Sequence, residues 1–422
     1  MRVETQCVQA GYQPENGQPR ILPIYQSTTY KYDSAEHLGK LFDLSVPGHM
    51  YTRISNPTVE MVENKIAALE GGVGAMLTSS GQAANLLAVL NIASAGDNIV
   101  CSSAIYGGTI NLFAFTLKRL GIETRFFTPE ATDEEIHALF DGRTRLVFGE
   151  TVANPALLVC DIERLAGIAH AHGVPLVIDN TFPTPVLCRP FEFGCDIVTH
   201  STTKYMDGHA SVVGGCIVDS GKFDWQAAGK YPELTEPDES YHGVVYTESF
   251  GNAAYITKAR TQLMRDFGCT PQPIAAFLLN LGLESLAVRM ERHCKNAQAV
   301  AEYLEKHPKV GWVNYPGLAS SPQHALAQKY LPKGVRGVVS FGVKGGREKA
   351  MRFMDSLKLA QIVVHVADAR TSVLHPASTT HRQLTDEQLV DAGISADLVR
   401  LSVGIENIED ILEDLAQAFD KL

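Results

Sequence analysis

Short apolar runs alternate with longer amphipathic stretches between residues 75 and 218. The apolar runs have the length of buried strands, and they cover residues 75–78, 98–102, 123–127, 145–150, 175–179, 196–200 and 212–218. Amphipathic stretches with a helical spacing of apolar positions lie between most of them, at residues 85–92, 109–120 and 162–172. The alternation predicts an α/β fold, with a mainly parallel seven-stranded sheet that helices cover on both faces. Ligands of such sheets bind at the carboxyl ends of the strands.

The segment before this alternation shows little helical periodicity. Residues 1–56 hold four prolines, and a stretch of this kind predicts an extended arm that must lie on another surface to be ordered. A helix is expected directly after the arm, from Pro57 to Leu69, because Asn56 can cap its start and Gly71 can end it.

The second half of the chain has a different pattern. Residues 220–250 interrupt the alternation with prolines and aromatic residues, which predicts a long surface insertion. Helical and strand-like apolar patterns then predict a smaller α+β domain, and they lie at residues 284–306, 338–343, 398–403 and 408–419. The expected organisation is an arm at residues 1–56, a large domain at 57–255 and a C-terminal domain at 256–422.

Composition and charge narrow the class of protein. Hydrophobic residues make up 45% of the 422 residues and charged residues 20%, as in an ordinary globular protein whose core needs no disulfide or metal support. The formal charge of −11 argues against a nucleic-acid partner, because such partners bind clustered Lys and Arg. No apolar run approaches the length of a membrane span, and the N-terminus lacks a signal-peptide core. We therefore expect a cytoplasmic protein without a membrane partner.

The cysteines and histidines point to neither disulfides nor a metal. The eight cysteines form no C-x-x-C pair and lie in apolar contexts, so we expect most of them to be small buried side chains. The closest histidine pair, His375 and His381, has no zinc-ligand spacing. The expected number of metal sites is therefore zero.

Two of the apolar runs end in groups with a chemical use. One run ends in Asp179, and another is followed by Ser201, Thr203 and Lys204. Either Asp179 or Lys204 alone is more often a turn residue or a solvated side chain. Together they meet the needs of pyridoxal phosphate, because an amine must bond to its aldehyde and a carboxylate must keep its pyridine nitrogen protonated. The neighbouring hydroxyls suit its phosphate oxygens.

A second phosphate site is predicted where the run at residues 75–78 turns into a helix. Gly81 lets the backbone approach a ligand closely, and the helix start offers N–H donors and the positive end of its dipole. A plain capped helix has the same pattern, so the turn indicates a phosphate site only when it is considered together with Asp179 and Lys204. The glycine runs of the chain fit neither the dinucleotide-binding nor the P-loop spacing.

The motifs that carry this chemistry resemble those of a known family. Residues 79–81, 179–181 and 201–205 are similar to motifs of the cysteine and methionine metabolism family of pyridoxal-phosphate enzymes, and the resemblance extends over essentially the whole chain. It implies a transferase of fold type I, the aspartate-aminotransferase-like fold, with a smaller α+β C-terminal domain. It also implies a homo-oligomer, a dimer with shared active sites that is expected to form a tetramer.

The resemblance implies a role for each matching residue. Lys204 would be the Schiff-base lysine and proton shuttle, Asp179 would pair with the pyridine nitrogen, and Tyr106 would stack on the ring and assist proton transfer. Arg400 would bind the substrate carboxylate. Five residues would bind the cofactor phosphate: Ser80, Gly81, Gln82, Ser201 and Thr203. Tyr51 and Arg53 would contact the cofactor of the neighbouring subunit, and Tyr51 would also contact its substrate and act as a catalytic residue. Asn154 would contact the cofactor hydroxyl and the substrate, and Val366 would contact the substrate.

Further segments indicate a branch of the family. Residues 220–225, 241–244, 314–318 and 375–381 resemble O-acetylhomoserine sulfhydrylases, and Gly108 stands where methionine gamma-lyases typically have cysteine. The implied reaction is gamma-replacement, in which O-acetyl-L-homoserine and sulfide or methanethiol give L-homocysteine or L-methionine and acetate. Residues 365–370 form a shorter run than sulfhydrylases usually have, which keeps a gamma-eliminating lyase or a cystathionine gamma-synthase or lyase as alternatives. A third hypothesis is a non-catalytic protein that binds a phosphorylated metabolite.

Overall fold

The computed structural model describes residues 1–153, 157–379, 382 and 395–422. Its large sheet has seven strands in the order β1-β7-β6-β5-β4-β2-β3. The strands are β1 (Gly74–Thr78), β2 (Asn98–Ser102), β3 (Glu123–Phe127), β4 (Thr144–Glu150), β5 (Leu176–Asp179), β6 (Ile197–His200) and β7 (Gly215–Asp219). Strand β7 runs antiparallel to β1 and β6, and the other neighbours are parallel. The expected mainly parallel sheet is therefore confirmed.

Helices cover both faces of this sheet. The helices of the large domain include α3 (Pro57–Glu70), α4 (Gly81–Leu90), α5 (Gly107–Asn111), α6 (Asp133–His137), α7 (Ile162–Ala171), α8 (Thr184–Leu187) and α12 (Ala254–Lys258). Leu176 and Ile178 of β5 lie in one core with α3 and α7, whereas Val177 between them lies in a second core with α4 and α12. Side chains that alternate along a strand thus fill both cores, as the two-residue period of a strand requires.

The start of α3 follows the capping pattern in the sequence. The side chain of Asn56 accepts a hydrogen bond from the Thr58 N–H at 3.0 Å, and Pro57 takes the first helical position. Gly71 ends the helix with a φ of +80°, a conformation that costs glycine little. The expected helix after the arm is therefore confirmed.

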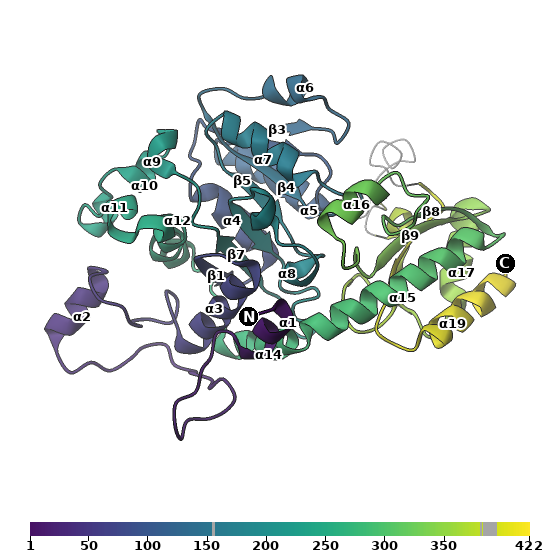
Figure 1. Cartoon of the computed structure of the whole chain (residues 1–422), viewed down its shortest axis with the longest axis horizontal. Coiled ribbons are helices and arrows are strands. Elements are labelled where there is room, and N and C mark those ends of the chain that lie inside the picture. The colour runs from purple at the N-terminus through teal and green to yellow at the C-terminus, as the bar shows by residue number, and fades with distance from the viewer. Residues whose placement is uncertain (154–156, 380–381, 383–394) are drawn as a thin grey trace.

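The N-terminal arm is less extended than the sequence predicted. It contains α1 (Val3–Gln9), which buries Val3 and Cys7 in the main core, and α2 (Ala35–Phe42), which projects from the body of the molecule (Figure 1). Each helix spans only about two turns, which is too short for a clear hydrophobic period. This is why the sequence pattern did not reveal them.

The insertion at residues 220–250 is not confined to the surface, contrary to the prediction. It forms the short helices α9 (Trp225–Ala228), α10 (Pro232–Thr235) and α11 (Tyr246–Phe250). Its large side chains fill the second core, where Trp225 stacks on Tyr255 with ring centroids 5.4 Å apart. Aromatic residues bury so much apolar area that a segment of short helices can be held firmly by a few of them.

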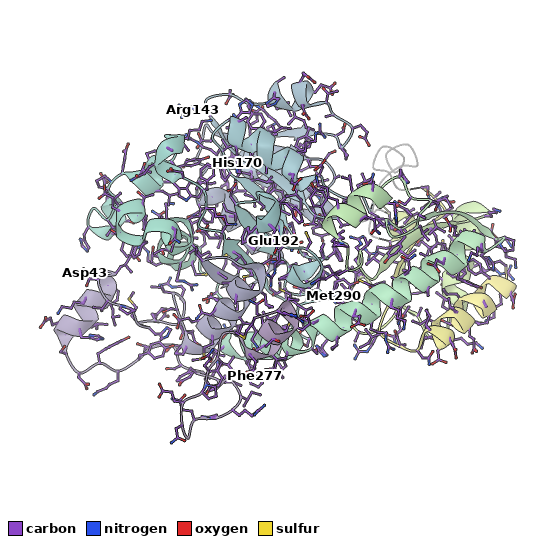
Figure 2. All side chains as sticks on the ribbon, in the orientation of Figure 1. Asp43, Arg143, His170, Glu192, Phe277 and Met290 are labelled. Atoms are coloured by element: carbon purple, nitrogen blue, oxygen red, sulfur yellow. The ribbon has the colours of Figure 1, made fainter. Side chains whose placement is uncertain are left out.

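The C-terminal part of the chain forms a second, five-stranded sheet. Its order is β10-β11-β12-β9-β8, with β8 (Val310–Asn314), β9 (Val338–Val343), β10 (Gln361–Ile362), β11 (Ser372–Leu374) and β12 (Leu398–Ser402). The helices here are α13 (Arg265–Phe267), α14 (Pro273–Glu284), α15 (Leu286–Lys306), α16 (His324–Tyr330), α17 (Gly346–Ser356) and α19 (Ile408–Asp420). The long helix α15, which carries the buried Met290, extends from the large sheet to the small one (Figure 2). The expected smaller α+β unit is confirmed.

The expected domain boundary at residue 256 falls within α12, whose residues pack into the second core of the large sheet.

All eight cysteines are free thiols, and six of them are buried. Within the described ranges, no group of three or more His, Cys, Asp or Glu side chains could hold a metal ion. Of the helices described, none is by itself long and apolar enough to cross a membrane, although α14 and α15 pass this test as a pair bent by 59°.

Candidate active site

The ends of β5 and β6 bring the predicted acid and lysine to one edge of the large sheet. Asp179 is the last residue of β5, and Lys204 follows the end of β6 by four residues. Asp179 Oδ1 accepts hydrogen bonds from the N–H and hydroxyl of Thr181, at 3.0 and 2.5 Å. Thr181 Oγ1 in turn accepts the Ser201 N–H at 2.8 Å. The acid and the loop that carries Lys204 are thus joined through one threonine.

Asp179 is a buried carboxylate prepared for a cationic partner. Its side chain is 8% exposed, and burial raises its pKa above the ordinary value, while the Thr181 hydrogen bonds and the charge of His200 oppose this rise. The Asn85 amide of α4 donates to Asp179 Oδ2 at 3.5 Å. A cation placed against this carboxylate would favour its ionised form, because burial makes an unpaired charge costly.

Lys204 has an amine that is easily deprotonated. Burial, and after it the charge of Arg400, lower its pKa from 10.5 to about 8, against the opposing effect of Asp368. Near pH 8 about half of such amines are uncharged, and only the uncharged amine can attack an aldehyde or accept a proton. Lys204 therefore meets the requirement for a nucleophile and for a base.

The start of α4 forms a cradle against the Lys204 loop. Ser80 caps the helix by accepting the Ala83 N–H at 3.1 Å. A Cβ atom at Gly81 would lie 2.6 Å from the Cβ of Ser201, so only glycine allows this approach. The Thr203 hydroxyl accepts the Gly214 N–H at 3.0 Å beside them. Helix N–H groups and two serine hydroxyls in this cradle suit a phosphate.

Tyr106 lies directly before α5, with half of its surface exposed. Its main-chain N–H donates to Glu150 Oε2 at 2.7 Å. A chain of hydrogen bonds joins this helix to the acid: Thr109 donates to Gln82 Oε1 at 3.2 Å, and the Asn85 amide donates to Thr109 at 3.2 Å as well as to Asp179. The predicted residues Gln82, Tyr106 and Asp179 are therefore brought together.

The small sheet contributes Arg400 to the same edge. Arg400 lies in β12, and burial lowers its pKa to about 10, while the charge of Tyr106 raises it. Its guanidinium donates to the Val364 carbonyl at 3.4 Å, two residues before the buried Val366. The Ala369 N–H donates to the Gly208 carbonyl at 2.9 Å, which joins the Val366 loop to the Lys204 loop.

Three predicted residues stand apart from this group. Tyr51 and Arg53 lie on the arm, where the Arg53 guanidinium stacks over the Tyr51 ring at 5.4 Å. Among the described residues, no hydrogen bond or ion pair links either of them to Asp179 or Lys204. Asn154 lies outside the described residues. The roles expected for these three residues stay predictions.

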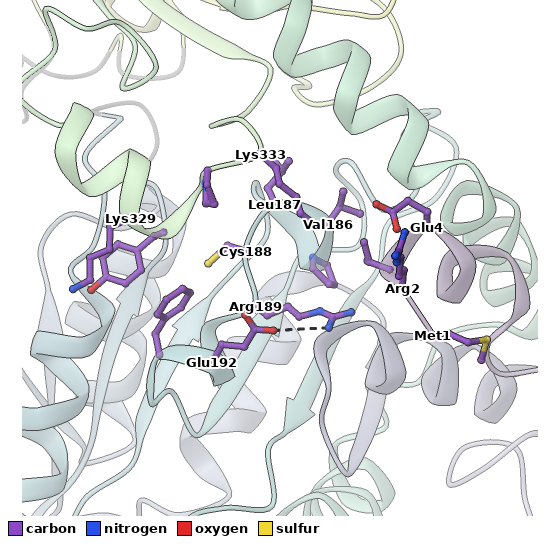
Figure 3. Close-up of a pocket in the computed structure, with 15 residues that line it drawn as sticks. Met1, Arg2, Glu4, Val186, Leu187, Cys188, Arg189, Glu192, Lys329 and Lys333 are labelled. Carbon is purple, nitrogen blue, oxygen red and sulfur yellow. Dashed lines mark ion pairs between the residues drawn. The ribbon is translucent and has the colours of Figure 1, made fainter.

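A hollow of about 340 Å³ lies elsewhere in the molecule. It is formed by α1, α8 and the chain after α16, and Figure 3 shows the ion pair of Arg189 and Glu192 within it. It is lined by none of the predicted site residues. The predicted chemistry is therefore concentrated at the strand ends and not in this hollow.

The strand-end residues fit pyridoxal phosphate. Lys204 offers an amine of lowered pKa, Asp179 offers a buried carboxylate, and Gly81 lets the start of α4 approach the Ser201 main chain closely. An amine, an acid and a phosphate cradle at the carboxyl edge of such a sheet define a pyridoxal-phosphate-dependent enzyme of fold type I.

Comparison with known proteins identifies the family. Residues 4–420 match the family model of the Cys/Met metabolism PLP-dependent enzymes, and the chain belongs to this family. It is 50% identical to the homocysteine synthase of Schizosaccharomyces pombe over 99% of this chain and 98% of that protein. It is 48% identical to O-acetyl-L-homoserine sulfhydrylase 1 of Thermus thermophilus over 99% of this chain and all of that protein.

A solved structure supports the same conclusion. A chain from Campylobacter jejuni assigned as an O-acetylhomoserine (thiol)-lyase superimposes with a TM-score of 0.95, at 36% identity over the whole of both chains. That chain carries an N'-pyridoxyl-lysine-5'-monophosphate. The predicted family, fold type and cofactor are confirmed.

Sequence reasoning gave no role to four residues that hold the site together, although Thr181 belongs to the 179–181 motif. These residues are nearly inaccessible, and each makes a hydrogen bond to or beside a predicted site residue: Asn85, Thr109, Thr181 and Glu150. A polar residue within an apolar helix, such as Asn85 in α4, was a further signal, because buried polar groups need partners.

Proposed function

We propose that this enzyme catalyses gamma-replacement on O-acetyl-L-homoserine, with sulfide or methanethiol as the incoming nucleophile. L-homocysteine or L-methionine and acetate are the products. The observation that carries the proposal is the 50% identity, over nearly the whole chain, to a protein named homocysteine synthase. The sulfhydrylase from Thermus thermophilus, at 48% identity, favours the same reaction over gamma-elimination.

Each residue at the strand ends has a distinct part in this proposal. The Lys204 Nζ accepts the proton that leaves the substrate α-carbon and returns it later, a task that its lowered pKa supports. Arg400 binds the substrate carboxylate with two parallel hydrogen bonds. Pyridoxal phosphate, when bound, withdraws electrons from the substrate carbon. Asp179 keeps the pyridine nitrogen protonated, because a buried carboxylate next to that nitrogen favours the cation.

Gamma-replacement also needs a second proton transfer and a site closed to water. A proton must leave the substrate β-carbon before the acetate at the γ-position can depart. The Lys204 amine can hold only one proton at a time, so it would take this second proton only after it has passed the first one on. The bond from Ala369 to Gly208 holds its loop against the Val366 loop. The Tyr106 ring would stack on the cofactor ring, which would hold the reacting atoms in place and exclude water.

The arm completes the site of a neighbouring copy in this proposal. Tyr51 is 41% exposed and Arg53 stacks on it, so both present polar groups away from the body of their own chain. A second copy would give this arm the surface that its exposed aromatic residues lack. We place the assembly at a dimer or a tetramer.

Three further expectations belong to the same proposal. Asn154 contacts the cofactor hydroxyl, and the chain divides into three parts at residues 56 and 255. The protein is cytoplasmic, a location that the eight free thiols support.

The test is a comparison of two reactions under the same conditions. The purified enzyme with pyridoxal phosphate is incubated with O-acetyl-L-homoserine and sulfide, and homocysteine and acetate are measured. A second sample contains L-methionine alone, and released thiol and 2-oxobutanoate are measured. We expect homocysteine formation to be the faster reaction by far. Faster thiol release from methionine would replace gamma-replacement by gamma-elimination.

A further inference from the structure

Glu150 is a buried acid placed beside another buried acid. It ends β4, and the register of the parallel strands pairs it with Asp179 at the end of β5. The two residues are 4% and 8% exposed. Paired residues of parallel strands point to the same face, so the two carboxyl groups lie side by side. Burying a second carboxyl group here is costly, and it requires a compensating interaction.

The Glu150 side chain holds the main chain of Tyr106. Its Oε2 accepts the Tyr106 N–H at 2.7 Å, across 44 residues of sequence. The Tyr106 side chain is 50% exposed, so packing around the ring gives it limited support. The hydrogen bond to Glu150 therefore fixes the point at which α5 begins and from which the ring projects.

The ring of Tyr106 is folded back over the first turn of α5. A Cβ atom at Gly108 would lie 2.5 Å from the Cε1 of Tyr106 and 3.0 Å from the Nε2 of Gln82. One edge of the ring thus lies close to the Gly108 main chain, near the Gln82 amide, while half of the residue stays exposed. Glu150 fixes the main chain from which the ring projects.

We infer that Glu150 is a positioning residue, whose carboxyl oxygen holds the Tyr106 main chain so that the ring keeps the orientation needed for stacking on the cofactor. The inference rests on the stacking role proposed for Tyr106. It concerns the reach of the Glu150 side chain rather than its charge, because a carboxyl oxygen accepts an N–H bond whether or not the group is ionised.

The surroundings of Glu150 agree with a role that does not need its charge. Burial and the charge of Asp179 raise the Glu150 pKa well above its ordinary value, while Arg336 and the Tyr106 N–H oppose the rise. Arg336 is fully buried and donates to the Val152 carbonyl at 3.0 Å. Its Nε and Nη2 have no hydrogen-bond partner among the described residues, and its positive charge acts on Glu150.

Two conservative variants separate reach from charge. Glu150→Gln keeps the length of the side chain and an oxygen that can accept the Tyr106 N–H, but has no charge. Glu150→Asp keeps the charge, but is one methylene shorter and cannot span the distance. The measurements on each purified holoenzyme are the visible circular dichroism of the bound cofactor, which reports how firmly the ring is held, the dissociation constant of pyridoxal phosphate, and kcat and KM for homocysteine formation.

We expect Glu150→Gln to stay within about threefold of the wild type in kcat and in cofactor affinity. We expect Glu150→Asp to lose about tenfold or more in kcat, with a weaker visible dichroism and a smaller change in KM, as the loss of a buried hydrogen bond implies. The reverse order, or equal losses in both variants, would overturn the inference. So would a Glu150→Asp enzyme with unchanged dichroism and kcat.

A matched pair elsewhere controls for stability. Asp414 is 7% exposed and accepts the N–H groups of Lys358, Leu359 and Ala360 at 2.8 to 3.0 Å. Asp414→Asn and Asp414→Glu should lower the unfolding temperature without changing the visible dichroism. The dichroism and the cofactor affinity need no substrate, so they test Glu150 even if the wild type makes no homocysteine. A wild type that makes no homocysteine would refute the proposed reaction but not the role inferred for Glu150.

Discussion

A single methyl group at Gly81 tests whether the cradle between α4 and the Lys204 loop binds phosphate. In Gly81→Ala the new Cβ would lie 2.6 Å from the Ser201 Cβ and 2.8 Å from its Cα. Ordinary contact begins at 3.4 Å, so the two segments must separate by about 0.8 Å. The atoms that must move belong to a serine and its main chain, not to the end of a flexible side chain. The variant therefore cannot relieve the contact by changing a rotamer.

The displacement would be passed on to the acid. The Ser201 N–H is bonded to Thr181 Oγ1 at 2.8 Å, and Thr181 is bonded to Asp179. Overpacking of this kind costs about 1–3 kcal/mol. If this free energy is lost in the cofactor-bound state, the cofactor affinity becomes roughly 5- to 150-fold weaker, at about 1.4 kcal/mol for each tenfold change.

The assay is the dissociation constant of pyridoxal phosphate, measured from visible absorbance after equilibrium dialysis. Gly167→Ala is the matched control, since a Cβ atom at Gly167 of α7 would meet nothing within 4 Å. We expect the control to bind like the wild type. A Gly81→Ala enzyme that binds the cofactor with unchanged affinity would show that the phosphate lies elsewhere.

Two further predictions follow from charge. Cofactor uptake by the cofactor-free enzyme should speed up as the pH rises through about 8, since only the uncharged Lys204 amine reacts. In Arg400→Met the midpoint of this rise should move to higher pH, because a cation that lowers the Lys204 pKa is removed. Stopped-flow absorbance measures both, and an unmoved midpoint would contradict the effect of Arg400 on Lys204. Burial raises the Asp219 pKa to about 7, above the value of about 4 in an unfolded chain, so stability falls as the pH rises from about 4 to about 7. Asp219→Asn should therefore raise the urea midpoint more at pH 8 than at pH 5, and an equal gain at both pH values would contradict this.

The sequence predicted those parts of the fold that repeat a local pattern. All seven strands of the large sheet were predicted, because each is a short run rich in apolar residues and most of them are buried. Asp179 and Lys204 could be proposed because a strand end followed by chemistry-bearing residues is itself a local pattern. Strands β8, β10 and β11 were not found, since β10 and β11 are only two and three residues long and most of β8 is not fully buried.

What the sequence could not predict depends on residues far apart in the chain. Asn85 and Asp179 are separated by 94 residues, Tyr106 and Glu150 by 44, and nothing local in either pair marks it as a contact. The insertion was misjudged for the same reason, because its aromatic residues are buried against residues outside it, such as Tyr255 of α12 and Arg145 of β4. Local patterns report what an element is, whereas its partners are set by the strand order of the sheet.

The strand order also explains why the site needs so few charged residues. Because β4, β5 and β6 are neighbours, Glu150, Asp179 and the Lys204 loop reach the same edge without any long side chain having to span it. Asn85 and Thr109 then link the acid to Gln82, so α4, which starts at the cradle, and the strand end that carries Asp179 are joined by hydrogen bonds between buried groups. A shift of α4 at its start must therefore disturb Asp179 by two routes, through Ser201 and Thr181 and through Asn85. This double connection is why a change at Gly81 should affect the acid as well as the phosphate.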